Sequence, residues 1–125
     1  MNLIPDRGVS GTPSRRTAIV RHVSPELLWS VTEVEPGSFV VGGEVDAHAA
    51  PMLAERLFMS TGSRIVLDLD GVTFMDSSGL RVIVQLHQRE LEGGPELVIT
   101  RPSRTVSRLF EIGGFAGLLR IDEDA

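Results

Sequence analysis

The sequence predicts an α/β fold in one domain, with a mixed sheet of four to five strands that a β-hairpin opens. About three helices are expected to pack mainly on one face of this sheet. The chain has 125 residues, the usual length of one domain. Its hydrophobic content of 42% is enough for a core. Strand-like runs then alternate with helical periodicity, which implies parallel strands joined by right-handed crossovers.

The beginning of the chain differs in composition from the rest. Residues 1–24 are rich in Gly, Pro, Ser, Thr and Arg and have no hydrophobic periodicity. They are therefore expected to form a flexible N-terminal extension, and the folded domain is expected to span residues 25–125. The domain opens with the hairpin, whose strands are predicted at 27–33 and 39–45 around the turn EPGS at 35–38.

A helix and a buried strand are expected after the hairpin. Pro51 suits a first helical turn, where its missing N–H costs nothing. The apolar residues that follow fall on one helical face, namely Leu53, Ala54, Leu57 and Phe58. In residues 65–70 the apolar Ile65, Leu67 and Leu69 alternate with Val66, Asp68 and Asp70. This alternation predicts a largely buried strand.

Two more helix–strand pairs complete the predicted domain. The segment 78–91 has a wide apolar stripe, formed by Leu80, Val82, Ile83, Val84, Leu86 and Leu91. Residues 97–100 form the next predicted strand. Pro102 and Ser103 open a third helix, which Gly113 and Gly114 end, with Val106, Leu109 and Phe110 facing inward. A last strand is predicted at 118–121.

Composition excludes several classes of protein. The chain has no cysteine, so neither a disulfide framework nor a thiolate metal site is possible. It has no long apolar run and no signal-peptide core, which predicts a cytoplasmic protein without a membrane partner. The net charge is −5, which argues against direct binding to nucleic acid.

The stretch FMDSSGLRV at 74–82 places three polar residues and a glycine where a strand passes into a helix: Asp76, Ser77, Ser78 and Gly79. Asp and Ser are favoured helix caps, each stabilising by about 1 kcal/mol. A single cap would be sufficient, and the Glu or Gln of a capping box is absent. Capping and a functional role for the serines therefore both remain open.

Catalysis, metal binding and nucleotide binding are poorly supported by the residues. His87 lies nine residues beyond Ser78 on the same predicted helix, about 13 Å away. His48 alone makes no catalytic triad, and there is no G-x-S-x-G elbow. Four aspartates could offer oxygens to a metal (Asp46, Asp68, Asp70 and Asp76), but strand-end carboxylates facing water are the better interpretation. Without lysine a P-loop is excluded. No enzyme activity, cofactor or metal is expected.

Covalent modification suits this segment better. A serine at a helix N-terminus lies at the positive end of the helix dipole, beside free N–H groups that tolerate a phosphate. Phosphorylation would add a charge of about −1.5 to −2 beside Asp76. Such a change alters a binding surface more than it alters the fold. Gly79 would allow another backbone to approach closely.

Three blocks of the sequence resemble one known family. VLDLDGVTFMDSSGLRVIV is similar to the signature of the STAS domain, as found in bacterial anti-sigma factor antagonists. VVGGEVDAHAAPML is similar to the stretch before the first helix of that family, and LVITRPSRTVSRLFEIGGF to its fourth strand and third helix. The blocks occur in the family's order and cover roughly residues 27–121. The resemblance implies a single STAS domain.

The resemblance also implies a function that is not enzymatic. Such antagonists bind an anti-sigma factor, usually a serine kinase, and thereby release a sigma factor to transcription, for example in a stress response. In this partner switching, the kinase phosphorylates the second serine of the D-S-S-G motif and blocks binding, and a serine phosphatase reverses the modification. By position the phosphorylated residue is Ser78.

The roles of the neighbouring residues are also implied by the resemblance. Asp76, Ser77 and Gly79 would support the phosphorylation site, while the partner would contact Glu44, Asp46, Ala47, Leu80 and Arg81, with Gly79 also close to it. The alternative function is a STAS module in another signalling assembly or a small-ligand sensor.

Overall fold

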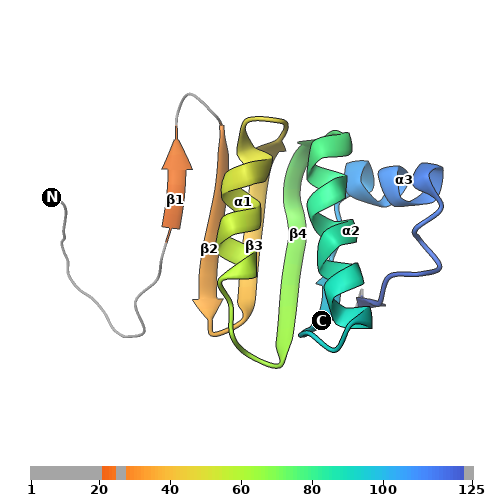
Figure 1. Cartoon of the computed structure of the whole chain (residues 1–125). Coiled ribbons are helices and arrows are strands. Elements are labelled where there is room, and N and C mark those ends of the chain that lie inside the picture. Colours follow the sequence, from red (N-terminus) through yellow and green to blue (C-terminus); the bar gives the residue numbers. More distant parts are fainter. Residues whose placement is uncertain (1–20, 25–27, 123–125) are drawn as a thin grey trace, which may run out of the picture.

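The computed structural model describes residues 21–24 and 28–122. Figure 1 shows the strands and helices of this part of the chain. In chain order they are β1 (Arg21–Ser24), β2 (Trp29–Glu35), β3 (Ser38–Val45), α1 (Ala49–Phe58), β4 (Arg64–Met75), α2 (Ser77–Leu91), β5 (Glu96–Thr100), α3 (Arg104–Gly113) and β6 (Ile121–Asp122).

The strands form one mixed sheet, in which the spatial order is the chain order from β1 to β6. The pairs β1–β2 and β2–β3 are antiparallel, and the pairs from β3 to β6 are parallel. The α/β class and the opening hairpin are thus confirmed. The described residues form six strands, however, where the sequence predicts four to five. The additional strand is β1, which pairs with β2 although it lies within the predicted extension at 1–24. Residues 1–20 of that extension lie outside the described part.

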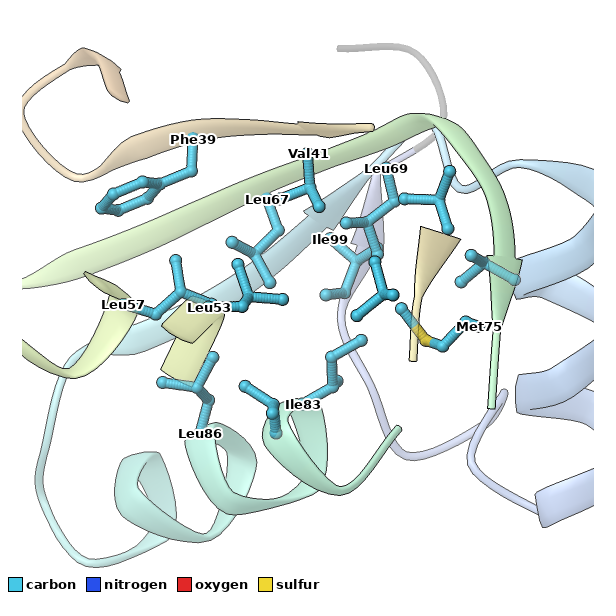
Figure 2. Close-up of a cluster of buried hydrophobic side chains, with 14 of the residues drawn as sticks. Phe39, Val41, Leu53, Leu57, Leu67, Leu69, Met75, Ile83, Leu86 and Ile99 are labelled. Atoms are coloured by element: carbon cyan, nitrogen blue, oxygen red, sulfur yellow. The ribbon is translucent and has the colours of Figure 1, made fainter. Parts of the chain in front are cut away.

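The core lies between the sheet and the helices on its face. Figure 1 shows α1 and α2 side by side in front of the sheet, and α3 lies beyond α2. In Figure 2, Phe39, Leu67 and Ile99 of the strands face side chains of α1 and α2. Each such buried Leu, Ile or Phe stabilises the fold by about 1.5–3 kcal/mol. This packing fixes the position of α2 relative to the strands.

The buried helix faces follow the predicted stripes. Leu53 and Leu57 of α1 are buried, as are Val106 and Phe110 of α3. The buried residues of α2 are Gly79, Val82, Ile83 and Leu86. The spacing of the apolar residues predicts that Leu91 belongs to this stripe, but its side chain is 72% exposed because α2 ends there and the chain turns away toward β5.

β4 is longer than the sequence suggests, and its length positions the site. Asp70 and Gly71 resemble the end of a strand, yet the strand continues to Met75. Gly71 pairs with Gly42 of β3, and the pairing continues as far as Val45 with Met75. It contains two register shifts, and at each of them β4 has one residue more than β3. The carboxyl ends of β3 and β4 therefore lie next to each other, directly before α1 and α2.

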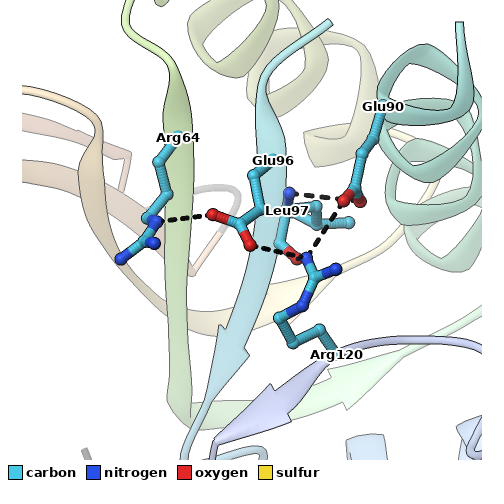
Figure 3. Close-up of polar contacts among 5 residues, drawn as sticks. All are labelled: Arg64, Glu90, Glu96, Leu97 and Arg120. Atoms are coloured by element: carbon cyan, nitrogen blue, oxygen red, sulfur yellow. Dashed lines mark hydrogen bonds and ion pairs between the residues drawn. The ribbon is translucent and has the colours of Figure 1, made fainter. Parts of the chain in front are cut away.

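The opposite end of β4 carries a network of charged side chains, shown in Figure 3. Arg64 donates to Glu96 at 2.8 Å. Arg120 forms an ion pair with Glu96 at 3.2 Å and a second one with Glu90 at 3.0 Å. Burial raises the pKa of Glu90, but the hydrogen bonds from Arg120 and from the Leu97 N–H outweigh it, so this pKa lies below its usual value. The network ties the starts of β4 and β5 to the end of α2.

Candidate functional site

The two aspartate-containing motifs meet at the carboxyl edge of the sheet. Val45 and Met75 are register partners in the parallel pair β3–β4. The next residues in the chain are Asp46 and Asp76, and the Asp76 N–H donates to the Val45 carbonyl oxygen at 3.4 Å. Segments thirty residues apart in the chain therefore form one surface, at the end where α1 and α2 begin.

Asp76 is the N-cap of α2. Its backbone is extended, with φ −108 and ψ −169, and its Oδ1 accepts the N–H groups of Ser78 at 2.9 Å and Gly79 at 3.4 Å. Its carbonyl oxygen accepts the Leu80 N–H at 3.1 Å. The role of N-cap thus explains why an aspartate occurs at position 76. These N–H groups are consequently not free for a phosphate, which differs from the prediction made for a serine at a helix start.

The two serines remain unexplained by capping. Ser77 and Ser78 are the first two residues of α2. Ser77 is exposed and Ser78 is half-buried. Neither hydroxyl forms a hydrogen bond with any group in the described part of the chain. Both hydroxyls are therefore available to another molecule.

Gly79 faces the interior of the domain. A Cβ atom at this position would lie 2.7 Å from Met75 Cγ, 2.9 Å from Val45 Cγ1 and 3.0 Å from the Val45 carbonyl oxygen. The backbone that approaches Gly79 is thus that of β3 in the same molecule. The sequence predicts the close approach of another backbone at Gly79, and within the domain that backbone belongs to β3. Gly79 is buried and lets α2 start close to the sheet.

Asp46 organises the start of α1 in a similar way. Its Oδ1 accepts the N–H groups of His48 at 3.0 Å and Ala49 at 3.1 Å, and its carbonyl oxygen accepts the Ala50 N–H at 2.9 Å. The hydrogen bond from Ala49 is the main reason that the pKa of Asp46 lies below its usual value. Asp46 therefore carries a fixed negative charge at this end of the domain.

A groove of about 300 Å³ runs between α1 and α2 and reaches Ser78. Its apolar lining comes from Ala47, Ala50, Pro51, Ala54 and Val82, and its polar lining from Ser78, Arg81 and Gln85. Of the predicted partner contacts, Ala47 and Arg81 thus lie beside Ser78. The groove residues that the sequence did not indicate as part of the site are Ala50, Pro51, Ala54, Val82 and Gln85. The alanines in the segment AHAAPMLA at 47–54 are the one signal that could have indicated a groove.

The predicted contacts Glu44, Asp46 and Leu80 do not line this groove. Glu44 is exposed near the end of β3, opposite Phe74 of β4 in the register. Leu80 is partly buried against the core. Arg81 is exposed, and within the described residues it forms neither an ion pair nor a hydrogen bond.

The aspartates considered as metal ligands have other partners. Arg101 pairs with Asp68 at 3.6 Å and with Asp70 at 2.9 Å. Across the described ranges, no three His, Asp or Glu side chains gather as they would around a metal ion. No helix in the same ranges is both long enough and apolar enough to cross a membrane.

The fold, with α2 starting in an Asp-Ser-Ser-Gly segment at the edge of a mixed sheet, is that of a STAS domain. The family model for the STAS domain matches residues 31–124. The chain belongs to the STAS domain family. The anti-sigma-B factor antagonist of Staphylococcus aureus (strain NCTC 8325 / PS 47) is 37% identical over 86 residues, covering 66% of this chain and 80% of that protein.

Solved structures agree with this fold. The structure of the anti-sigma factor antagonist SpoIIAA in its unphosphorylated form has a TM-score of 0.57 at 22% identity, covering 77% of this chain and 89% of that one. The structure of the Bacillus cell fate determinant SpoIIAA in the phosphorylated form has a TM-score of 0.54 at 21% identity, covering 77% and 92%.

Proposed function

We propose that this protein is an anti-sigma factor antagonist. In its unmodified form it binds an anti-sigma factor of the serine kinase type and releases a sigma factor to transcription. Phosphorylation of Ser78 by that kinase ends the binding, and a serine phosphatase restores it. The observation that carries this proposal is the pair of serine hydroxyls at the start of α2, which the fold leaves unbonded within its described part.

The proposed partner surface consists of residues around the starts of α1 and α2: Glu44, Asp46, Ala47, Leu80 and Arg81. Ser78 lies among them because it lines the groove between the helices, and Ala47 and Arg81 line it as well. This position favours Ser78 over Ser77, which is not part of the groove lining. The protein acts in the cytoplasm by binding alone and is itself acted upon, so it needs no cofactor or metal.

Electrostatics explain how one phosphate could end the binding. The group adds a charge of about −1.5 to −2 near the carboxylates of Asp46 and Asp76. A partner surface that fits the neutral serine would then bury a charge without a counter-charge. Such mismatches cost about 2–5 kcal/mol, which lowers affinity by a factor of about 30 to several thousand. The fold is unaffected because the Ser78 hydroxyl holds nothing in place.

A phosphorylation assay tests the identity of the modified residue. The wild type, Ser77→Ala and Ser78→Ala would be incubated with ATP and the purified anti-sigma factor kinase of the same organism. Phosphate should be transferred to the wild type and to Ser77→Ala and be absent from Ser78→Ala. Transfer to Ser78→Ala at the rate of the wild type would disprove this assignment.

A binding assay tests the switch itself. Ser78→Asp should bind the same kinase at least about 30-fold more weakly than the wild type, with unchanged circular dichroism. Ser78→Ala should bind like the wild type. Equal affinity of Ser78→Asp and the wild type would contradict the mechanism.

A further inference from the structure

We propose that Arg81 is the intramolecular counter-charge of phosphorylated Ser78. The phosphate would capture the Arg81 guanidinium and so withdraw a cation from the partner surface. This inference rests on the proposed function, because it describes how the modified state of that same site is held. Phosphorylation would then change the surface twice, by adding a dianion and by removing a free positive charge.

The placement of the two residues supports the capture. Ser78 and Arg81 are three residues apart on α2, and both line the groove between α1 and α2. Side chains three apart on a helix are neighbours, with about 5–6 Å between their Cβ atoms. A guanidinium binds phosphate oxygens through two parallel hydrogen bonds, a geometry that the long Arg side chain can reach.

The backbone at the start of α2 offers the phosphate little. Asp76 Oδ1 already accepts the N–H groups of Ser78 and Gly79, and the Asp76 carbonyl oxygen accepts that of Leu80. A phosphate on Ser78 could use these donors only by displacing the Asp76 carboxylate. Repulsion from that carboxylate pushes the phosphate away from the helix start, and the groove provides one cation, Arg81.

Arg81 is also free to respond. Arg64, Arg101 and Arg120 are each paired with carboxylates. Arg81, by contrast, has no ion pair or hydrogen bond within the residues that the structure describes. Its capture by a phosphate would therefore break no existing contact. In the unmodified protein the same guanidinium can pair with a carboxylate of the anti-sigma factor.

The test measures the second ionisation of the phosphate by ³¹P NMR. Phosphoserine would be incorporated at position 78 during translation, in the full chain and without a kinase, so the result does not depend on whether a kinase recognises Ser78. The phosphate of the wild type should titrate about 0.15–0.4 pH unit lower than that of Arg81→Gln, the shift expected from a helix-surface ion pair. Contributions of Asp46, His48 and Asp76 are common to both proteins and cancel.

Two further variants make the test specific. Arg64→Gln removes one positive charge at the opposite end of β4 and should titrate like the wild type. Arg81→Lys should recover part of the shift, because an ammonium keeps the charge but loses the two-point contact. The proposal is wrong if Arg81→Gln titrates like the wild type, or if Arg64→Gln changes the titration as much as Arg81→Gln does.

Discussion

The Asp76 carboxylate accepts the backbone N–H of Ser78 at 2.9 Å, so the residue beside the proposed phosphorylation site is also a structural cap. The Oδ1 atom of Asp76 holds the first turn of α2 in place, and the negative charge of the Asp76 carboxylate lies next to Ser78. Changes at Asp76 will therefore affect stability as well as recognition, and the two effects have to be measured separately.

Removing the cap should destabilise the domain. Asp76→Ala leaves the N–H groups of Ser78 and Gly79 without their acceptor. Loss of an N-cap costs about 1 kcal/mol, which urea unfolding would measure as a lower midpoint with an unchanged slope. Asp76→Ser should recover most of this free energy because serine is also a good cap. Ser77→Ala serves as the control and should stay within about 0.5 kcal/mol of the wild type.

Gly79→Ala should also destabilise the domain, although alanine has a higher helix propensity than glycine. Alanine in a helix is favoured over glycine by about 1 kcal/mol. The new methyl group would however meet Met75 Cγ and the Val45 carbonyl oxygen, and overpacking of this kind costs about 1–3 kcal/mol. We expect a net loss, seen as a lower melting temperature. Gly117→Ala, where no heavy atom lies within 4 Å, is the matched control. A Gly79→Ala protein more stable than the wild type would refute the close packing.

The charged network around Glu90 and Arg120, at the end of β4 opposite the site, should make the stability of the domain depend on pH. The pKa of Glu90 is lowered in the folded state, although burial opposes this, because Arg120 and the Leu97 N–H bond to its carboxylate. The stabilisation is thus present above the ordinary pKa of 4.5 and is lost as the pH falls through the lower folded value. Glu90→Gln should lower the free energy of unfolding by about 1 kcal/mol at pH 7.

Acid should remove this difference. Chemical unfolding of the wild type and Glu90→Gln would be compared at pH 7 and below pH 4, where the two free energies should converge. Glu92→Gln, with an exposed side chain, makes the same change in charge and should remain close to the wild type at pH 7. A Glu90→Gln defect that stays constant between these pH values would show that ionisation of Glu90 is not the cause.

The helices could be predicted because their apolar residues repeat at the helical period, as Leu53 and Leu57 do in α1 and Val106 and Phe110 in α3. β1 could not be predicted, since it joins the sheet through its backbone and its sequence RHVS has no strong pattern. The apolar Leu118 and Leu119 predict a last strand at 118–121, which is too early in the chain. Leu118 is 62% exposed, and pairing with β5 begins only at Ile121.

The sequence singles out the residues of the proposed site, but it does not give their geometry. Asp76 and Ser78 stand out in the sequence because three polar residues occur where one cap is enough. The role of Gly79 and the groove beside Ser78 depend on how closely α2 approaches β3 and α1, which is a property of the packed domain. No pattern within one segment contains that information.

The direct pairing of Val45 with Met75 has a consequence for engineering. The loops that follow these residues are held in mutual register by the sheet, so each is shaped against the other. If only one loop were exchanged for that of a paralogue, the new loop would face a loop with which it had not evolved. A chimera intended to respond to a different kinase should therefore receive both segments, 44–54 and 74–85, together.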